Sequence, residues 1–312
     1  MTPRPLGPTG LAIAPIVFGG NVLGWTLPED EAFRVLDAFV DHGFDAIDTA
    51  DVYSIFAGTA PGTSEEVLGR WFAARPGMRE RVTLITKVGL DMGGVGEKGL
   101  SPRWIAEGSE RSLKRLKTDR IDLYFAHVPD PDTPPADTLA AFEALIDAGK
   151  VRALGASNYD ADTIRAALDV AEDERLAGFQ VVQPRYNVAD RGDFEGPMRE
   201  LCIERGLGVI TYFSLANGFL TGKYRTMAEI EASPRAEWLR GYMSDENLAL
   251  VTALHEVADR HRARPAEVAL AWSMAQPGVT APIASATSVE QVASFARAAA
   301  LTLSAEDLAA LG

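Results

Sequence analysis

Four residues that can carry protons stand near the ends of short, mostly apolar runs of the chain. Asp48, Lys87 and His127 each end one of these runs, and Tyr53 comes five residues after Asp48. A run of about four to eight mainly apolar residues bounded by turn residues is typical of a buried strand. Any one of these side chains alone is more often a buried polar group without a catalytic role. Four of them at matching strand ends favour a catalytic site.

Together these side chains could protonate an oxygen atom. The pKa of a free phenol is about 10, which is too high for an effective acid at neutral pH. A nearby ammonium group lowers that pKa, so Lys87 could activate Tyr53 while Asp48 keeps Lys87 charged and oriented. His127 could hydrogen-bond a substrate carbonyl or share a proton with Tyr53. The sequence therefore predicts a site that protonates a developing alkoxide while a second component delivers hydride.

The elements that must position these residues alternate between strand and helix. The predicted strands cover residues 15–19, 44–48, 82–87, 121–127, 151–157, 179–183, 207–212 and 279–284. Amphipathic stretches between them predict helices over residues 29–41, 65–74, 103–116, 138–148, 161–170 and 197–205. This alternation predicts a closed (β/α)8 TIM barrel, with its active site at the carboxyl ends of the strands. A doubly wound open sheet is disfavoured, because no strand, tight turn and helix carry a dinucleotide fingerprint.

Two kinds of segment lie outside this repeat. Residues 7–10 read Gly-Pro-Thr-Gly between short apolar pieces, which predicts an N-terminal β-hairpin that closes one end of the barrel. The connections 54–63 and 216–244 are long, and they are either lids at the carboxyl face or plain surface insertions. The length of 312 residues fits one barrel, so we expect a single domain over residues 1–312.

Composition limits the classes of partner. The chain is 47% hydrophobic and 24% charged, which is ordinary for a globular protein, and it has no apolar run of membrane-spanning length. We expect a cytoplasmic protein with no membrane contact, and the single Cys202 fits a reducing compartment. A net charge of −14 without a basic face argues against nucleic acid, and four histidines without metal-ligand spacing argue against a metal. The expected partner is a small molecule; the oligomeric state is not predicted.

A series of motifs, taken in order, resembles the aldo-keto reductases over nearly the whole chain. The matching segments are DTADVY at 48–53, SEEVLG at 64–69, ITK at 85–87, DLYFAH at 122–127, GASN at 155–158, QPRYN at 183–187 and GFLTGKY at 218–224. The chain is more similar to the bacterial and potassium-channel-beta-like branch than to the mammalian aldose reductases.

The resemblance implies that Asp48, Tyr53, Lys87 and His127 form the catalytic tetrad, with Tyr53 as the general acid or base. It implies reduction of an aldehyde or ketone carbonyl, or the reverse reaction, with NADP(H) preferred and NAD(H) as the alternative. The implied cofactor-binding residues are Gly19, Gly20, Asp48, Ser157, Asn158, Gln183, Tyr212, Phe213, Ser214, Leu215, Ala216, Gly218, Lys223, Arg235, Ser285, Ala286, Thr287 and Gln291.

Within that set, three polar residues are implied to hold the carboxamide, and Tyr212 is implied to stack on the nicotinamide ring. The three polar residues are Ser157, Asn158 and Gln183. Their side chains can supply the donors and acceptors that an amide needs. By position, the substrate pocket walls are Trp25, Phe56 and Trp238, each of which could equally be a structural aromatic residue.

Two segments depart from the family pattern near the cofactor. The usual Ser-Pro-Leu after the stacking tyrosine is Phe213-Ser214-Leu215, so an aromatic ring replaces a hydroxyl group near the pyrophosphate. The usual Glu-Asn near the end of the chain is Ser294-Phe295, which removes the expected contacts to adenine and leaves Phe295 for apolar contact. These changes concern cofactor affinity rather than the proton chemistry.

The preference between NADP(H) and NAD(H) depends on cations near the 2′-phosphate, which attracts positively charged donors. No Arg or Lys lies in the segment 285–291, which is expected to face the adenosine half of the cofactor. Lys223 and Arg235, both in the long second loop, are therefore the predicted cations. Glu290 is the opposing residue, because a carboxylate near the ribose favours NAD(H).

Two other functions stay open at this stage. Lys87 could act as the Schiff-base nucleophile of a lyase, a role that buried lysines can play. The protein could instead be a regulatory subunit that senses the cofactor and rarely turns over, because an intact tetrad does not exclude that role.

Overall fold

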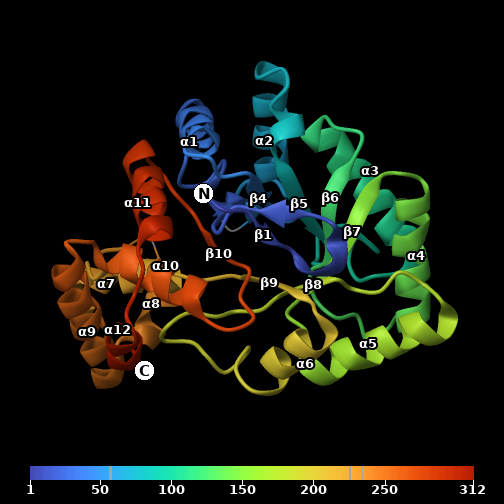
Figure 1. Cartoon of the computed structure of the whole chain (residues 1–312). Coiled ribbons are helices and arrows are strands. Elements are labelled where there is room, and N and C mark those ends of the chain that lie inside the picture. The colour runs from blue at the N-terminus through green and yellow to red at the C-terminus, as the bar shows by residue number, and fades with distance from the viewer. Residues whose placement is uncertain (56–57, 225, 234) are drawn as a thin grey trace.

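The computed structural model describes residues 1–55, 58–224, 226–233 and 235–312 (Figure 1). Within them, eight parallel strands form a closed barrel in the order β10-β3-β4-β5-β6-β7-β8-β9. The strands are β3 (Val17–Gly19), β4 (Ala46–Asp48), β5 (Thr83–Val88), β6 (Ile121–Ala126), β7 (Val151–Ser157), β8 (Val181–Gln183), β9 (Gly208–Thr211) and β10 (Ala281–Ala284). Each lies inside or within one residue of its predicted range, and the prediction of a TIM barrel is confirmed.

Helices surround the strands, as Figure 1 shows. The longer ones are α1 (Glu29–Asp41), α2 (Thr63–Ala74), α3 (Pro102–Leu116), α4 (Pro135–Asp147), α5 (Ala161–Glu174), α6 (Pro197–Arg205), α9 (Asp245–His261), α10 (Pro265–Ala275) and α11 (Val289–Ala300). Local sequence sets their ends: the Ser101 side chain accepts a hydrogen bond from the Trp104 main chain at the start of α3, and Lys117 ends that helix in a left-handed conformation.

The long connection after β9 is largely structured. It contains the 3₁₀ segments η5 (Ala216–Thr221) and η6 (Arg240–Tyr242) and the short helices α7 (Met227–Glu231) and α8 (Ala236–Leu239). Other short elements are the 3₁₀ segments η1 (Gly7–Thr9), η2 (Gly20–Val22) and η4 (Arg79–Arg81), and the final helix α12 (Ala305–Ala310).

The inside of the barrel is a packed apolar core. Alternate residues of the strands fill it, and the aromatic ring of Phe125 occupies the space that Gly155 leaves on the next strand. A Cβ at position 155 would lie 2.4 Å from that ring, so glycine is required there for packing. The core residues on the strands are Val17, Ala46, Ile85, Leu123, Phe125, Ala153, Val181, Ile210, Ala281 and Ile283.

The predicted N-terminal hairpin is present and closes the amino end of the barrel. Strand β1 (Arg4–Pro5) pairs antiparallel with β2 (Ala12–Ile13), and the hairpin side chains Leu6, Leu11 and Ile13 join the interior core. Gly7 lies against the main chain just before β8 and at the start of β9. With the amino end filled by apolar side chains, ligands can reach the barrel interior from the carboxyl end.

This packing predicts different costs for two glycine substitutions in the hairpin. Gly7 and Gly10 both have positive φ, but a Cβ at Gly7 would lie 2.3 Å from the nitrogen of Gly208, whereas none of the surroundings comes within 4 Å at Gly10. Gly10→Ala should cost only the backbone strain of about 1–2 kcal/mol. Gly7→Ala should lower the unfolding free energy by about 1–3 kcal/mol more, because of overpacking. Denaturant unfolding of both variants checks this; equal losses would mean that the hairpin is not tightly seated.

Candidate active site

A cavity of about 770 Å³ opens at the carboxyl ends of the barrel strands. Its size is in the range of sites that enclose small molecules and cofactors. Most of the residues predicted to bind the cofactor or substrate line it, namely Gly19, Trp25, Asp48, Tyr53, His127, Ser157, Asn158, Gln183, Tyr212, Phe213, Ser214, Leu215, Gly218, Lys223, Arg235, Ser285, Thr287 and Gln291. Residues far apart in the sequence therefore meet around one space, as expected for this end of a TIM barrel.

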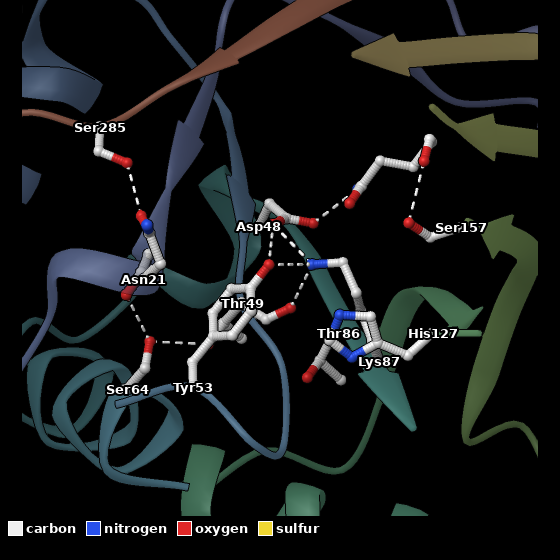
Figure 2. Close-up of polar contacts among 12 residues, drawn as sticks. Asn21, Asp48, Thr49, Tyr53, Ser64, Thr86, Lys87, His127, Ser157 and Ser285 are labelled. Carbon is white, nitrogen blue, oxygen red and sulfur yellow. Dashed lines mark hydrogen bonds and ion pairs between the residues drawn. The ribbon is translucent and has the colours of Figure 1, made fainter. Parts of the chain in front are cut away.

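A fully buried ion pair lies at the floor of the cavity. Lys87, near the end of β5, donates from Nζ to Asp48 Oδ2 at 2.7 Å and to the main-chain oxygen of Thr49 at 2.9 Å. Its third donor contact is to the hydroxyl oxygen of Tyr53, at 2.9 Å (Figure 2). The other carboxylate oxygen of Asp48 accepts from Gln183 Nε2 at 2.9 Å. All three ammonium hydrogens of Lys87 thus have acceptors, and the pair connects β4, β5 and β8.

The environment of Tyr53 keeps its proton on the phenol. Burial and then the negative charge of Asp48 raise the pKa of Tyr53 well above its ordinary value. Burial lowers the pKa of Lys87, while Asp48 opposes this change and favours the ammonium form. The expectation that Lys87 would lower the pKa of Tyr53 below that of a free phenol is therefore wrong for the protein without cofactor. The chain presents Tyr53 as a protonated donor.

His127 lies beside Tyr53 as a neutral imidazole. The two ring centres are 6.0 Å apart, and His127 is almost fully buried. Burial and the charge of Lys87 lower the pKa of His127 well below its ordinary value. Its Nδ1 has no hydrogen-bond partner among the described residues. A neutral imidazole can donate to a ligand oxygen without adding a second positive charge beside Lys87.

The three residues predicted to hold a carboxamide form one hydrogen-bonded group. Asn158 donates from Nδ2 to the main-chain oxygen of His127 at 2.9 Å and to Ser157 Oγ at 3.2 Å. Ser157 donates to the main-chain oxygen of Gln183 at 2.9 Å. The Tyr212 hydroxyl donates to Asn158 Oδ1 at 2.7 Å, which fixes the tyrosine ring at the edge of the group.

Backbone strain gathers at the same face of the barrel. Asn158 after β7, and Phe213, Ala216 and Asn217 after β9, all have positive φ, which is uncommon for residues other than glycine. Strained conformations persist only where the surrounding structure enforces them, and they cluster at ligand-binding sites. The segment after β9 thus has the character of a shaped binding loop.

Some predicted residues lie outside the cavity lining. Gly20, Ala216 and Ala286 are buried behind the lining; at Gly20 a Cβ would lie 2.8 Å from the main-chain oxygen of Asp48. Trp238 does not line the cavity but packs edge-on against Trp25, with ring centres 5.7 Å apart. Phe56 lies outside the described residues. The described part of the loop 54–63 contributes no lining residue, whereas the second long loop contributes several.

Several lining residues were not predicted to contact the cofactor or substrate, although Thr221 and Tyr224 lie in a matching motif. They are Asn21, Val22, Thr26, Asn217, Thr221, Tyr224, Ser233, Arg264, Ala266, Leu270, Ile283 and Ala284. Asn21, which accepts a hydrogen bond from Ser285 at 2.7 Å, directly follows the glycine pair and could have been found from that position. Arg264 lies in the connection between α9 and α10 and carries no local motif. Ser294 and Phe295, the departures from the family pattern, do line the cavity.

A second polar group lies behind Lys87. Glu65 is fully buried and accepts hydrogen bonds from Thr86 and from Arg115, both at 2.6 Å. Asp51 is also buried, and neither of its carboxylate oxygens has a hydrogen-bond partner among the described residues. Burial and the charge of Glu65 raise the pKa of Asp51 well above its ordinary value. A buried carboxyl group without partners is stable only in its neutral form.

Asp51→Asn should therefore stabilise the protein in a pH-dependent way. The unfolded chain releases the Asp51 proton near pH 3.8, while the folded chain keeps it, so the parent loses stability as pH rises above that value. The difference in unfolding free energy, variant minus parent, should grow between about pH 4 and pH 7, by at most about 1.4 kcal/mol per pH unit. Thermal or denaturant unfolding across this range measures it. Asp132→Asn, at an exposed position, is the control; a pH-independent difference for Asp51→Asn would refute the neutral carboxyl.

Comparison with known proteins identifies the family. The sequence profile of the Aldo/keto reductase family matches residues 15–312. The chain belongs to the aldo/keto reductase family. This confirms the predicted resemblance, and the family and its oxidoreductase relatives indicate oxidoreductase chemistry with a nicotinamide cofactor.

Individual relatives are similar over almost their full length. The chain is 34% identical over 295 residues to the "Probable voltage-gated potassium channel subunit beta" of Arabidopsis thaliana, covering 92% of this chain and 88% of that protein. It is 33% identical over 309 residues to the "Uncharacterized oxidoreductase YrpG" of Bacillus subtilis, covering 97% and 92%. It is 32% identical over 286 residues to the "Aldo-keto reductase str7" of Strobilurus tenacellus, covering 91% and 80%. The bacterial and channel-beta-like relatives are those that the motifs indicated.

The described residues contain neither a membrane span nor a cluster of metal ligands. No helix there has the length and apolar character needed to cross a membrane. No group of three or more histidine, cysteine, aspartate or glutamate side chains there is arranged to hold a metal ion.

Proposed function

We propose that this protein reduces aldehyde or ketone carbonyls to alcohols, or catalyses the reverse reaction, with NADP(H) as cofactor and Tyr53 as general acid or base. The observation that carries this proposal is the phenol of Tyr53, 2.9 Å from the buried ammonium group of Lys87 and exposed to a large cavity. The proposal includes one domain over residues 1–312, acting in the cytoplasm on a small molecule.

The cavity residues fit a nicotinamide cofactor. Ser157, Asn158 and Gln183 line the cavity with hydroxyl and amide groups of the kind that pair with a carboxamide, and the Tyr212 ring beside them offers a stacking face. Gly19 leaves space that a side chain would fill, because a Cβ there would lie 2.6 Å from Ser285 Oγ. When bound, the reduced cofactor supplies the hydride.

The chain's own residues supply the proton and stabilise the phenolate that its transfer leaves. Tyr53 donates its phenolic proton to the oxygen of the carbonyl as negative charge develops there. Lys87 stabilises the phenolate that results, since its ammonium group is 2.9 Å from that oxygen. Asp48 orients Lys87, and neutral His127 can hydrogen-bond the same substrate oxygen and so hold it toward Tyr53.

A preference for NADP(H) is supported by the charges around the cavity. The chain carries a net charge of −14, yet Lys223, Arg235 and Arg264 all line this cavity. Cations there suit the phosphates of a dinucleotide, and a 2′-phosphate adds further charge for them to bind.

The test is to incubate the protein with NADPH or NADH and a panel of aldehydes, ketones and sugars, and to follow the nicotinamide absorbance. Faster turnover with NADPH is expected; tighter binding of NADH would contradict the preference.

Tyr53→Phe tests the acid directly. This variant keeps the ring and removes the proton donor, so cofactor binding should persist while turnover falls by roughly 10²–10⁴-fold. Cofactor affinity from fluorescence titration and turnover from steady-state kinetics separate the two effects. Tyr159→Phe, which removes a hydroxyl away from the cavity, should keep normal turnover. Near-normal turnover of Tyr53→Phe would remove Tyr53 from the mechanism.

Lys87→Met tests the ion pair. It leaves Asp48 as an uncompensated buried charge, so we expect a loss of about 3–5 kcal/mol in unfolding free energy. Turnover should fall by at least about 10²-fold, because the phenolate of Tyr53 loses its stabilising charge. The double variant Asp48→Asn with Lys87→Met should recover part of the stability but none of the turnover. Retention of the parent's turnover and pH profile by Lys87→Met would contradict this role.

Two alternatives make different predictions. A regulatory role is favoured by the similarity to a protein named as a channel subunit, and it predicts tight cofactor binding with no turnover across the carbonyl panel. A Schiff-base lyase would need an accessible, neutral amine on Lys87, and the burial and three hydrogen bonds of that residue argue against it. Borohydride trapping of substrate on Lys87 would favour the lyase.

A further inference from the structure

Arg264 supplies a cation to the part of the cavity that is lined by the segment 285–291. It immediately precedes α10 and lines the cavity together with Thr287 and Gln291, which stand before and within α11. Its Nη2 donates to Glu290 Oε1 at 2.8 Å. The segment 285–291 itself contains no Arg or Lys. Tertiary packing of α10 against α11 therefore supplies the guanidinium group from about 20 residues away in sequence.

The pair between Arg264 and Glu290 is well placed to open. The two side chains are 56% and 72% exposed, and exposed pairs contribute only about 0–1 kcal/mol to stability. A phosphate dianion offers a guanidinium group more charge and more acceptor oxygens than a carboxylate does. An anion entering this end of the cavity can therefore replace Glu290 as the partner of Arg264.

The neighbouring residues leave further donors at the same place. Gln291 Oε1 accepts from the main-chain nitrogen of Thr287 at 2.7 Å, which leaves the amide nitrogen of Gln291 as a donor. By contrast, Arg235 packs over the ring of Trp25 at 5.6 Å and donates to the main-chain oxygen of Asn217 at 3.3 Å. Arg235 is thus engaged with a different part of the lining.

We infer that Arg264 is the residue that recognises the 2′-phosphate of NADP(H), with Glu290 as its partner until the cofactor binds. The inference rests on the proposed function, and it deepens that proposal by naming a specificity residue outside the segment 285–291. Glu290, which alone would favour NAD(H), here holds the guanidinium group in place and competes with the phosphate. Removing Glu290 should therefore strengthen binding of the 2′-phosphate rather than weaken it.

The test measures two adenosine fragments by calorimetry, without turnover. We compare 2′,5′-ADP, which carries one phosphate at the 2′ position and one at the 5′ position, with 5′-ADP, which carries both phosphates at the 5′ position. Arg264→Gln should weaken 2′,5′-ADP by roughly 10–100-fold, the range expected for a charge-assisted contact, and change 5′-ADP by less than about twofold. Glu290→Gln should tighten 2′,5′-ADP by roughly 2–10-fold and leave 5′-ADP unchanged, because it removes one competing charge.

Two controls show whether the affinity changes are specific to the Arg264 side chain. Arg165→Gln removes an equivalent charge from an exposed pair with Asp162 on α5, away from the cavity, and should change neither affinity. The contact of Arg264 with Glu267 at the start of α10 uses the main-chain nitrogen, so Arg264→Gln keeps it, and thermal unfolding confirms that the variant folds.

The outcomes separate the inference from the proposed function. Suppose that the parent protein prefers 2′,5′-ADP. If Arg264→Gln then keeps the same ratio of the two affinities, the inference is overturned while the preference for NADP(H) stands. Loss of the preference for 2′,5′-ADP in Arg235→Ala, but not in Arg264→Gln, would likewise overturn the inference. A parent that binds neither fragment nor NADPH would instead overturn the proposed function.

Discussion

The buried ion pair between Lys87 and Asp48 is the interaction on which the rest of the site depends. Removing two charges from water costs several kcal/mol for each ion, and it is offset only where geometry and additional hydrogen bonds are good. Here Lys87 meets three acceptors and Asp48 is held from its other side by Gln183. Such an arrangement is weak evidence for stability, but it fixes the position of an ammonium group next to a phenol. The barrel can hold it because three different strands contribute to one polar layer.

The apolar parts of the barrel determine where this polar layer can lie. The hairpin fills the amino end, and side chains such as Phe125 fill the middle, so the cavity opens at the carboxyl ends of the strands. The same strands therefore carry apolar residues through most of their length and a polar residue at the end. The connection after β9 then completes the cavity with main chain in strained conformations and with cations.

Sequence patterns predicted what depends on single strands and their ends. The strand ranges, the hairpin and the meeting of Asp48, Lys87 and His127 followed from short apolar runs and the rule that parallel strands end at one face. The direction of the pKa shift of Tyr53 did not follow, because burial and Asp48 outweigh Lys87 in the folded chain. Spacing alone reveals the neighbours of a residue in sequence, whereas a pKa depends on all groups around it.

Arg264 shows the same limit for residues that line the cavity. Its connection carries no motif, and only the packing of α10 against α11 brings it next to Glu290 and Gln291. Asp51 is a further case, since it stands in the same motif as Asp48 and Tyr53, yet its carboxyl group is buried without hydrogen-bond partners among the described residues. Conversely, Ala216 and Ala286 are among the residues that the resemblance implies to bind the cofactor, yet both are buried and neither lines the cavity, because residues next to a binding position can support a site without touching the ligand.

The most direct test is to measure the titration of Tyr53 itself. Tyrosine labelled with carbon-13 at the ring carbon that bears the hydroxyl gives an NMR signal that shifts when the phenol ionises, and the Tyr53→Phe variant assigns it. We expect the Tyr53 signal of the cofactor-free protein to keep its protonated position up to at least about pH 10, the ordinary phenol value. Ionisation of Tyr53 near neutral pH would contradict the claim that the buried pair of Lys87 and Asp48 presents it as a protonated donor.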